Sequence, residues 1–272
     1  MGDKERTSRH LSVGCFRPLP NACQFFRARL RASTSMGGMG SRVRSGSTSR
    51  PLGMVAWIVA LLGVRNVGEV VLPAVAYVPT NVAVGAVLLA VARRRGSSWE
   101  DLGFDGRHIR RGLTVGAVAG AAAMVAMLMA AALPMTRGFF DDARVPADAP
   151  GWERLYQTVI RIPIGTVLFE ELAFRGVLLA VLCRQLRLRA AVGVNSALFG
   201  LWHIVPTLST ATANGIEGLA RVGMVAGSVL GTAVAGVVFC ALRVRARHVV
   251  APALLHLAFN DVGYLIAWWV RS

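Results

Sequence analysis

Residues 167–181 read VLFEELAFRGVLLAV, an apolar run interrupted by Glu170, Glu171 and Arg175. A charged side chain at the centre of a membrane-spanning helix costs roughly 2.5–3.5 kcal/mol, so three charges in one segment imply polar partners or a polar cavity. On a helix, Glu171 and Arg175 are four residues apart and share a face, which predicts that the arginine neutralises this carboxylate. Glu170 is turned by about 100° from Glu171, so its carboxylate is available for another role.

The rest of the chain has the composition of a membrane protein. Of the 272 residues, 54% are hydrophobic and only 16% are charged. From Leu52 onward, apolar stretches follow one another, each near the roughly 20 residues that cross about 30 Å of hydrocarbon. We therefore expect an all-α, polytopic membrane helical bundle with about seven spans, the fourth kinked at Pro163. The expected spans cover about residues 52–68, 71–92, 112–134, 155–182, 190–206, 222–242 and 248–270.

Three parts follow along the chain. Residues 1–50 are rich in Arg, Ser and Gly without an apolar period, which predicts a disordered tail. A transit peptide, or a true start at Met36, Met39 or Met54, would also explain this segment. Residues 51–111 hold the first membrane helices and a loop, and residues 112–272 form the membrane core that carries the polar groups.

The charge of the chain, formally +16, is unevenly distributed. The tail holds ten basic residues against Asp3 and Glu5, and segments 93–111, 184–189 and 243–247 are rich in arginine. The acidic side chains of the alternate loops, 135–153 and 207–220, are Asp141, Asp142, Asp148, Glu153 and Glu217. Positive loops mark the cytoplasmic side, so we expect a multi-pass plasma-membrane protein, in contact with the lipid bilayer, whose N-terminus is cytoplasmic. No basic face with interleaved aromatics indicates nucleic-acid binding.

Small and sulfur-containing residues are interpreted as packing groups. Gly223, Gly227 and Gly231 form a stripe on the sixth span that predicts close contact with another helix. The four cysteines, at positions 15, 23, 183 and 240, have neither zinc spacing nor a disulfide pattern, so we expect free thiols.

Three more polar residues lie in later spans: His203 in FGLWH, and His256 with Asn260 in HLAFN. Counting 1.5 Å of rise per residue from the cytoplasmic ends places Glu170 about 18 Å deep, His203 about 20 Å, Asn260 about 16 Å and His256 about 10 Å. Each could simply form an interhelical hydrogen bond. Together, however, a carboxylate, two imidazoles and an amide can activate water and stabilise an oxyanion.

Other hydrolytic signatures are missing. The chain has no HExxH zinc motif and no G-x-S-x-G elbow. Ser196 and Ser228 lie in apolar helices without a glycine-framed context, and we interpret both as packing or back-bonding hydroxyls.

Three motifs occur in order on separate predicted helices: Glu170-Glu171-x-x-x-Arg175, Phe199-x-x-x-His203 and His256-x-x-x-Asn260. Over residues 110–270 this pattern resembles the CAAX-protease and bacteriocin-processing (CPBP) family of intramembrane glutamic endopeptidases. The resemblance implies that Glu170 is the catalytic base, that His203 helps it to activate water, and that His256 and Asn260 stabilise the oxyanion. It also implies supporting roles for Glu171 and Arg175, packing of Phe199 under His203, and no cofactor.

The resulting hypothesis is an intramembrane endopeptidase that hydrolyses a bond in a peptide or membrane-protein substrate. A zinc site formed by Glu170, His203 and His256 is an alternative, because two histidines and a carboxylate can ligate this metal. Non-enzymatic alternatives are an immunity-type scaffold and a proton-coupled transporter, although the chain shows no internal repeat. We interpret Asp261 as a carboxylate hydrogen-bonded within the bundle.

Overall fold

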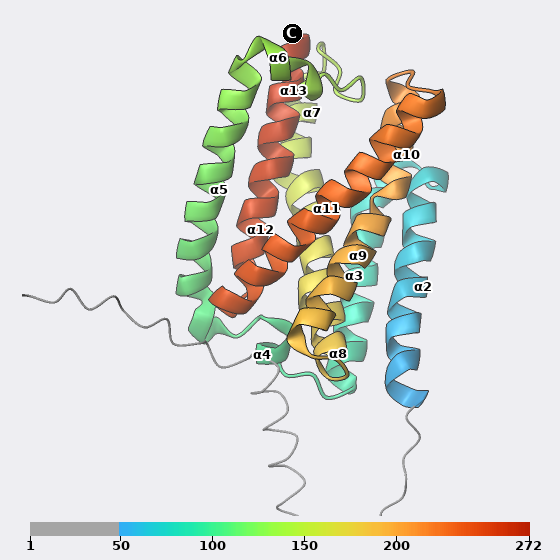
Figure 1. The fold of residues 1–272 in the computed structure, drawn as a ribbon, viewed down its shortest axis with the longest axis vertical. Helices are drawn as coiled ribbons and strands as arrows, with labels where there is room; N and C mark the ends of the chain where they lie inside the picture. The colour runs from blue at the N-terminus through green and yellow to red at the C-terminus, as the bar shows by residue number, and fades with distance from the viewer. Residues whose placement is uncertain (1–48) are drawn as a thin grey trace, which may run out of the picture.

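The computed structural model describes residues 49–272, in which every regular element is a helix (Figure 1). The tail predicted to be disordered lies outside these residues. The first crossings are α2 (Ser49–Val71), α3 (Tyr77–Arg94) and α5 (Ile109–Ala132). The fourth is one continuous helical segment made of α7 (Gly151–Tyr156), η4 (Gln157–Leu168), η5 (Glu171–Leu178) and α8 (Leu179–Cys183). The last three are α9 (Leu188–Trp202) with α10 (Ile204–Ala213), then α11 (Gly218–Ala246), and α12 (Val250–Leu257) with η6 (Ala258–Val262) and α13 (Gly263–Arg271).

Short helices occupy the connections. They are η1 (Ala74–Ala76), α4 (Trp99–Leu102), η2 (Gly106–His108), α6 (Pro134–Arg137) and η3 (Gly138–Phe140). By length and hydropathy, six helices of the described chain could cross a membrane. The fourth crossing is not among them because its middle carries Arg161, Glu170, Glu171 and Arg175. The all-α polytopic bundle is confirmed, and seven spans is an approximate count.

The connections between the helices lie at two opposite ends of the bundle. Figure 1 shows α4, α8 and the start of α2 at one end, and α6 and the C-terminus at the other. The arginine-rich segments therefore gather at the end where α2 begins, and the loops with the acidic residues lie opposite. This is the alternation expected from the charge pattern.

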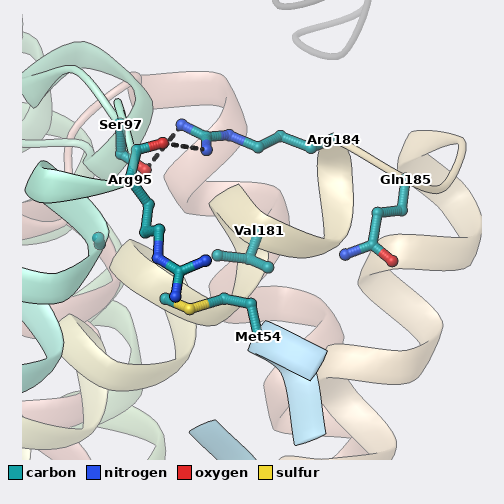
Figure 2. Close-up of a pocket in the computed structure, with 7 residues that line it drawn as sticks. Met54, Arg95, Ser97, Val181, Arg184 and Gln185 are labelled. Atoms are coloured by element: carbon teal, nitrogen blue, oxygen red, sulfur yellow. Dashed lines mark hydrogen bonds between the residues drawn. The ribbon is translucent and has the colours of Figure 1, made fainter. Parts of the chain in front are cut away.

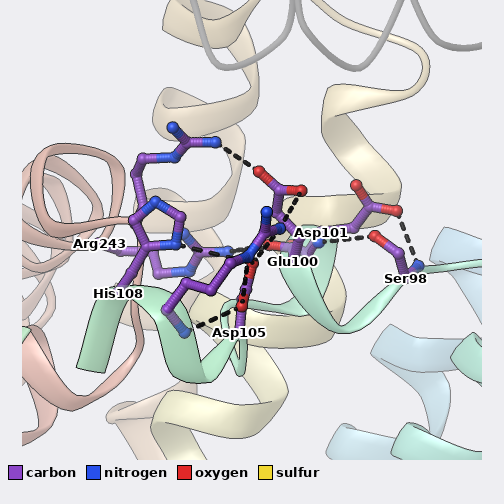
Figure 3. A network of polar contacts seen from close by, with 8 residues as sticks. Ser98, Glu100, Asp101, Asp105, His108 and Arg243 are labelled. Atoms are coloured by element: carbon purple, nitrogen blue, oxygen red, sulfur yellow. Dashed lines mark hydrogen bonds and ion pairs between the residues drawn. The ribbon is translucent and has the colours of Figure 1, made fainter.

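A polar network holds the basic end together (Figure 3). Arg243 of α11 donates from Nη2 to the backbone oxygens of Glu100 and Asp101, at 3.2 and 3.0 Å. Arg247 pairs with the Glu100 carboxylate. Gly103 has φ of +81° and lies against the Arg243 guanidinium, so only a residue without a Cβ fits between them. These contacts fix α4 against the end of α11.

Glycines allow two helices to pack closely, but these helices are not the ones that the sequence predicted. A Cβ on Gly116 of α5 would lie 2.8 Å from the Ala251 oxygen of α12, so these two helices touch through their backbones. The prediction that the stripe on the sixth span contacts another helix was wrong, because a Cβ added at Gly223, Gly227 or Gly231 would meet no atom of the described residues within 4 Å. Glycine spacing alone does not tell which face of a helix turns toward the bundle.

Wide helical turns mark the fourth and seventh crossings. Segments η4, η5 and η6 are π-helical, and Pro163 lies within η4. A proline ring clashes with the carbonyl four residues earlier and lacks an N–H, so a wider turn accommodates it. Turns of this type are frequent at functional sites. The fourth crossing packs against α3, α9, α11 and α12, which places it inside the bundle.

Candidate functional site

The three sequence motifs come together from the fourth crossing, α9 and α12. Glu171 and Arg175 are completely buried, and Glu170 and His256 are 5% and 6% exposed. Buried charges of this kind persist only when they are paired or hydrogen-bonded.

Glu171 links two helices. Its Oε1 accepts a hydrogen bond from Arg175 Nη1 at 3.1 Å and lies 2.9 Å from His256 Nδ1. The pairing with Arg175 was predicted from the spacing, whereas the contact with His256 was not. A carboxylate accepts hydrogen bonds, so Nδ1 of His256 carries the hydrogen and Nε2 is the ring atom left to face the site.

Aromatic rings surround the Arg175 guanidinium. Its Cζ lies 3.9 Å from the centroid of Phe199 and 4.7 Å from that of Phe239. The Phe239 ring also stacks on His256 at 5.0 Å. Cation–π contacts strengthen when desolvated, so these rings stabilise the arginine that holds Glu171 in place.

Glu170 is held by a residue that the sequence interpretation did not include. The indole Nε1 of Trp202 donates to Glu170 Oε1 at 2.9 Å. The second oxygen, Oε2, is buried without a hydrogen bond and lies 3.8 Å from His256 Nε2. One carboxylate oxygen is thus oriented by a hydrogen bond, and the other has no hydrogen bond but faces His256. The only available signal was that Trp202 directly precedes a motif histidine.

His203 lies at the joint between α9 and α10, with φ −82° and ψ 0°. This right-handed helical conformation is where α9 ends and α10 begins. Its Nδ1 lies 2.8 Å from the Phe199 oxygen, which can only accept, so Nε2 is again the available ring nitrogen. The Phe199 ring contacts both imidazoles edge-on, at 4.7 Å from His203 and 6.1 Å from His256. In the described part of the chain, no hydrogen bond joins His203 directly to Glu170.

Asn260 lies in η6, one turn beyond His256. Its Nδ2 is buried and has no hydrogen-bond partner. Asp261 was predicted to be hydrogen-bonded within the bundle. Its Oδ1, however, is also buried without a hydrogen-bond partner. Buried polar atoms are nearly always satisfied, so the unpaired atoms on Glu170, Glu171 and Asn260 can each accept or donate a further hydrogen bond.

The zinc alternative needs Glu170, His203 and His256 to converge on one point. Within the described residues, no group of three His, Cys, Asp or Glu side chains is placed to hold a metal ion. The geometry therefore does not favour that alternative.

A pocket of about 250 Å³ lies elsewhere, at the basic end of the bundle (Figure 2). Its lining includes Met54, Arg95, Val181 and Arg184, and none of the motif residues. It is thus separate from the candidate site.

Comparison with known proteins agrees with the three motifs. Residues 152–262 match the family model of type II CAAX prenyl endopeptidase Rce1-like proteins, and this range contains Glu170, His203, His256 and Asn260. No curated protein and no solved structure matches the chain. This match confirms the resemblance drawn from the sequence: the chain carries a domain of the Rce1-like family within a bundle of membrane-spanning helices.

Proposed function

We propose that the protein is an intramembrane endopeptidase in which Glu170 activates the attacking water. The observation that carries the proposal is the state of this carboxylate, which is buried, oriented through Oε1 by Trp202 and without a hydrogen bond at Oε2. A general base must be fixed in position and must have an oxygen free to accept a proton.

The neighbouring groups have matching roles in the proposed reaction. Oε2 of Glu170 takes a proton from water, with Nε2 of His203 as the second acceptor, and the resulting hydroxide attacks the substrate carbonyl carbon. Asn260 Nδ2 donates to the oxyanion that forms, and His256 donates from Nε2 as an imidazolium, whose other N–H, at Nδ1, is bound to Glu171. When the intermediate collapses, the C–N bond breaks and Glu170 returns the proton to the leaving amine. Glu171 and Arg175 keep His256 in position, and the mechanism requires no metal ion.

We further infer that the basic end faces the cytoplasm, which places the N-terminal tail there and the C-terminus across the membrane. This follows from the positive-inside rule applied to the arginine-rich connections. The proposed location is the plasma membrane, and the proposed substrate is a peptide or a membrane-associated protein.

An immunity-type scaffold is less consistent with the site. A group of polar residues that only joins helices would be expected to pair its atoms with one another. Here Glu170 Oε2, Glu171 Oε2 and Asn260 Nδ2 are buried without partners.

The test uses the purified full-length protein in nanodiscs and a panel of quenched fluorescent peptides, with and without a farnesyl group. Glu170→Ala and His203→Ala should each lower kcat by about 10²-fold or more, because general acid–base groups contribute about 10²–10⁴-fold. Glu217→Ala, in an exposed loop, is the matched control. Size-exclusion profiles and thermal midpoints verify folding.

Retained cleavage in folded Glu170→Ala protein would disprove the role of this carboxylate. Treatment with 1,10-phenanthroline should leave the rate unchanged. Loss of activity that added zinc restores would favour the metal-dependent alternative instead.

A further inference from the structure

Arg65 of α2 is a buried arginine that the proposed mechanism does not use. It lies outside residues 152–262 and is only 5% exposed. An ionisable side chain inside a membrane bundle is by default a functional candidate, because burial of its charge is unfavourable unless something compensates for it.

The direct contacts of Arg65 hold its guanidinium without a close ion pair. Its Nε donates to Asn81 Oδ1, and its Cζ lies 5.0 Å from the centre of the Tyr77 ring. Its Nη1 is buried with no hydrogen-bond partner. Among the described residues no carboxylate lies within ion-pair distance of Arg65. Glu69, one turn further along α2, attracts both Arg65 and Arg161 at longer range, so one carboxylate serves two guanidinium groups. A fixed guanidinium with an unengaged nitrogen is suited to a planar anion.

A second guanidinium lies nearby. Arg161 of η4 contacts the same Tyr77 ring, with its Cζ 4.4 Å from the centroid, and donates from Nη1 to Gln157 Oε1 at 3.3 Å. The Tyr77 hydroxyl is 2.9 Å from Thr166 Oγ1. The Tyr77 ring therefore contacts two guanidinium groups, those of Arg65 and Arg161.

Hydrogen bonds connect this cluster to the candidate site. Asn66, the residue after Arg65, donates from Nδ2 to the Trp202 oxygen at 2.8 Å, and the Trp202 indole binds Glu170. Asn81 donates to the Gly165 oxygen at 2.7 Å, five residues before Glu170. Arg65 therefore lies beside two segments that position Glu170, which Asn66 and Asn81 contact through Trp202 and Gly165.

We propose that Arg65, with Arg161 beside it, binds a negatively charged group of the substrate, namely its terminal α-carboxylate. This inference rests on the proposed endopeptidase function. A peptide segment that enters an apolar bundle carries mostly uncharged side chains, and the free carboxylate at its end is the anion that it always has. Arg65 would then set how far the peptide end lies from Glu170, and so select the bond that is cleaved.

The experiment compares binding of two forms of one farnesylated fluorescent peptide, ending either in a free carboxylate or in a carboxamide. Binding is measured by fluorescence anisotropy to full-length Glu170→Gln protein, which keeps the site but cannot act as base. A charge-assisted hydrogen bond should give the acid form an affinity at least about tenfold higher. Arg65→Gln in the same background should remove this preference while leaving the affinity for the amide unchanged.

Arg94→Gln, which changes an exposed arginine in the last turn of α3, is the matched control and should keep the preference. If Arg65→Gln does not fold, Arg65→Lys decides the question, because it keeps the charge and loses the planar fork. The preference should then shrink.

Equal affinities for the acid and the amide in the parent protein, or no binding of either form, would overturn the proposal. An equal loss of both affinities in Arg65→Gln would also overturn it, because that result indicates a structural role only. Hydrolysis is not needed for this measurement, so an absent carboxylate preference is distinguishable from failure of the proposed catalytic function.

Discussion

Replacement of Trp202 by Phe tests whether the indole orients the proposed base. The substitution removes the Nε1 donor that lies 2.9 Å from Glu170 Oε1 and keeps an aromatic ring against Phe174 and Phe169. The hydrogen bond from Asn66 to Trp202 involves the backbone oxygen, so it should survive the change.

The expected size of the effect follows from the environment of this bond. Trp202 is 8% exposed and Glu170 is 5% exposed, so bulk solvent does not readily replace the lost donor. A hydrogen bond to a charged group contributes about 1.5–3 kcal/mol, which corresponds to roughly 10- to 150-fold in kcat if the full loss falls on the transition state. KM should change little, because the indole contacts the base and not the substrate in the proposed arrangement.

The assay is steady-state cleavage of the quenched peptide by protein in nanodiscs, with kcat and KM determined separately. Trp57→Phe is the control, because Trp57 is 38% exposed and the chemical change is the same. A folded Trp202→Phe protein with kcat within about twofold of the parent would refute the idea that the indole holds Glu170 for catalysis.

Three further outcomes are expected. Asn260→Ala should raise the reaction barrier by about 2.7–4 kcal/mol if its amide donates to the oxyanion, which kcat with the same peptide would measure. Gly116→Ala should destabilise the bundle by about 1–3 kcal/mol, because the added methyl meets backbone 2.8 Å away, whereas Gly227→Ala should not; thermal midpoints in detergent distinguish them. Burial, and next the Arg243 charge, lower the pKa of His248 below its ordinary 6.5. The His248 ring accepts the backbone N–H at the start of α12, so its stabilising effect should be complete above about pH 6.5 and lost as the pH falls through the lowered pKa. Thermal midpoints between pH 7.5 and 5.5 should fall more in the parent than in His248→Gln, and equal slopes would contradict this account.

The sequence was most informative where burial is costly. Charges at Glu170, Glu171 and Arg175 cannot be placed in lipid without partners, so their presence located the central helix and the i,i+4 pair, which the structure contains. The apolar runs likewise predicted the spans. The main difference is in the fifth span, which was predicted to end at residue 206 but has a joint at His203 and continues as α10 to Ala213. There α10 continues past Pro206, which lies in its first turn, where a missing N–H has little cost.

Contacts that depend on helix rotation could not be predicted. Trp202 is one of six tryptophans, and its place before the motif histidine does not reveal that its indole reaches a carboxylate 32 residues earlier. The contact between His256 and Glu171 spans 85 residues and depends on how α12 is turned against η5. Asn66 lies in a helix without a recognisable motif, although it binds the backbone of Trp202.

The wide turns of the fourth crossing also affect protein engineering. In such turns each backbone N–H bonds five residues back, so side chains are spaced differently around the axis than in an ordinary α-helix. Transplanting only the polar side chains of residues 170–175 onto a regular helix of a designed bundle would therefore aim them in altered directions. A designer would need to graft the whole segment 157–178, with its backbone geometry, to reproduce the arrangement.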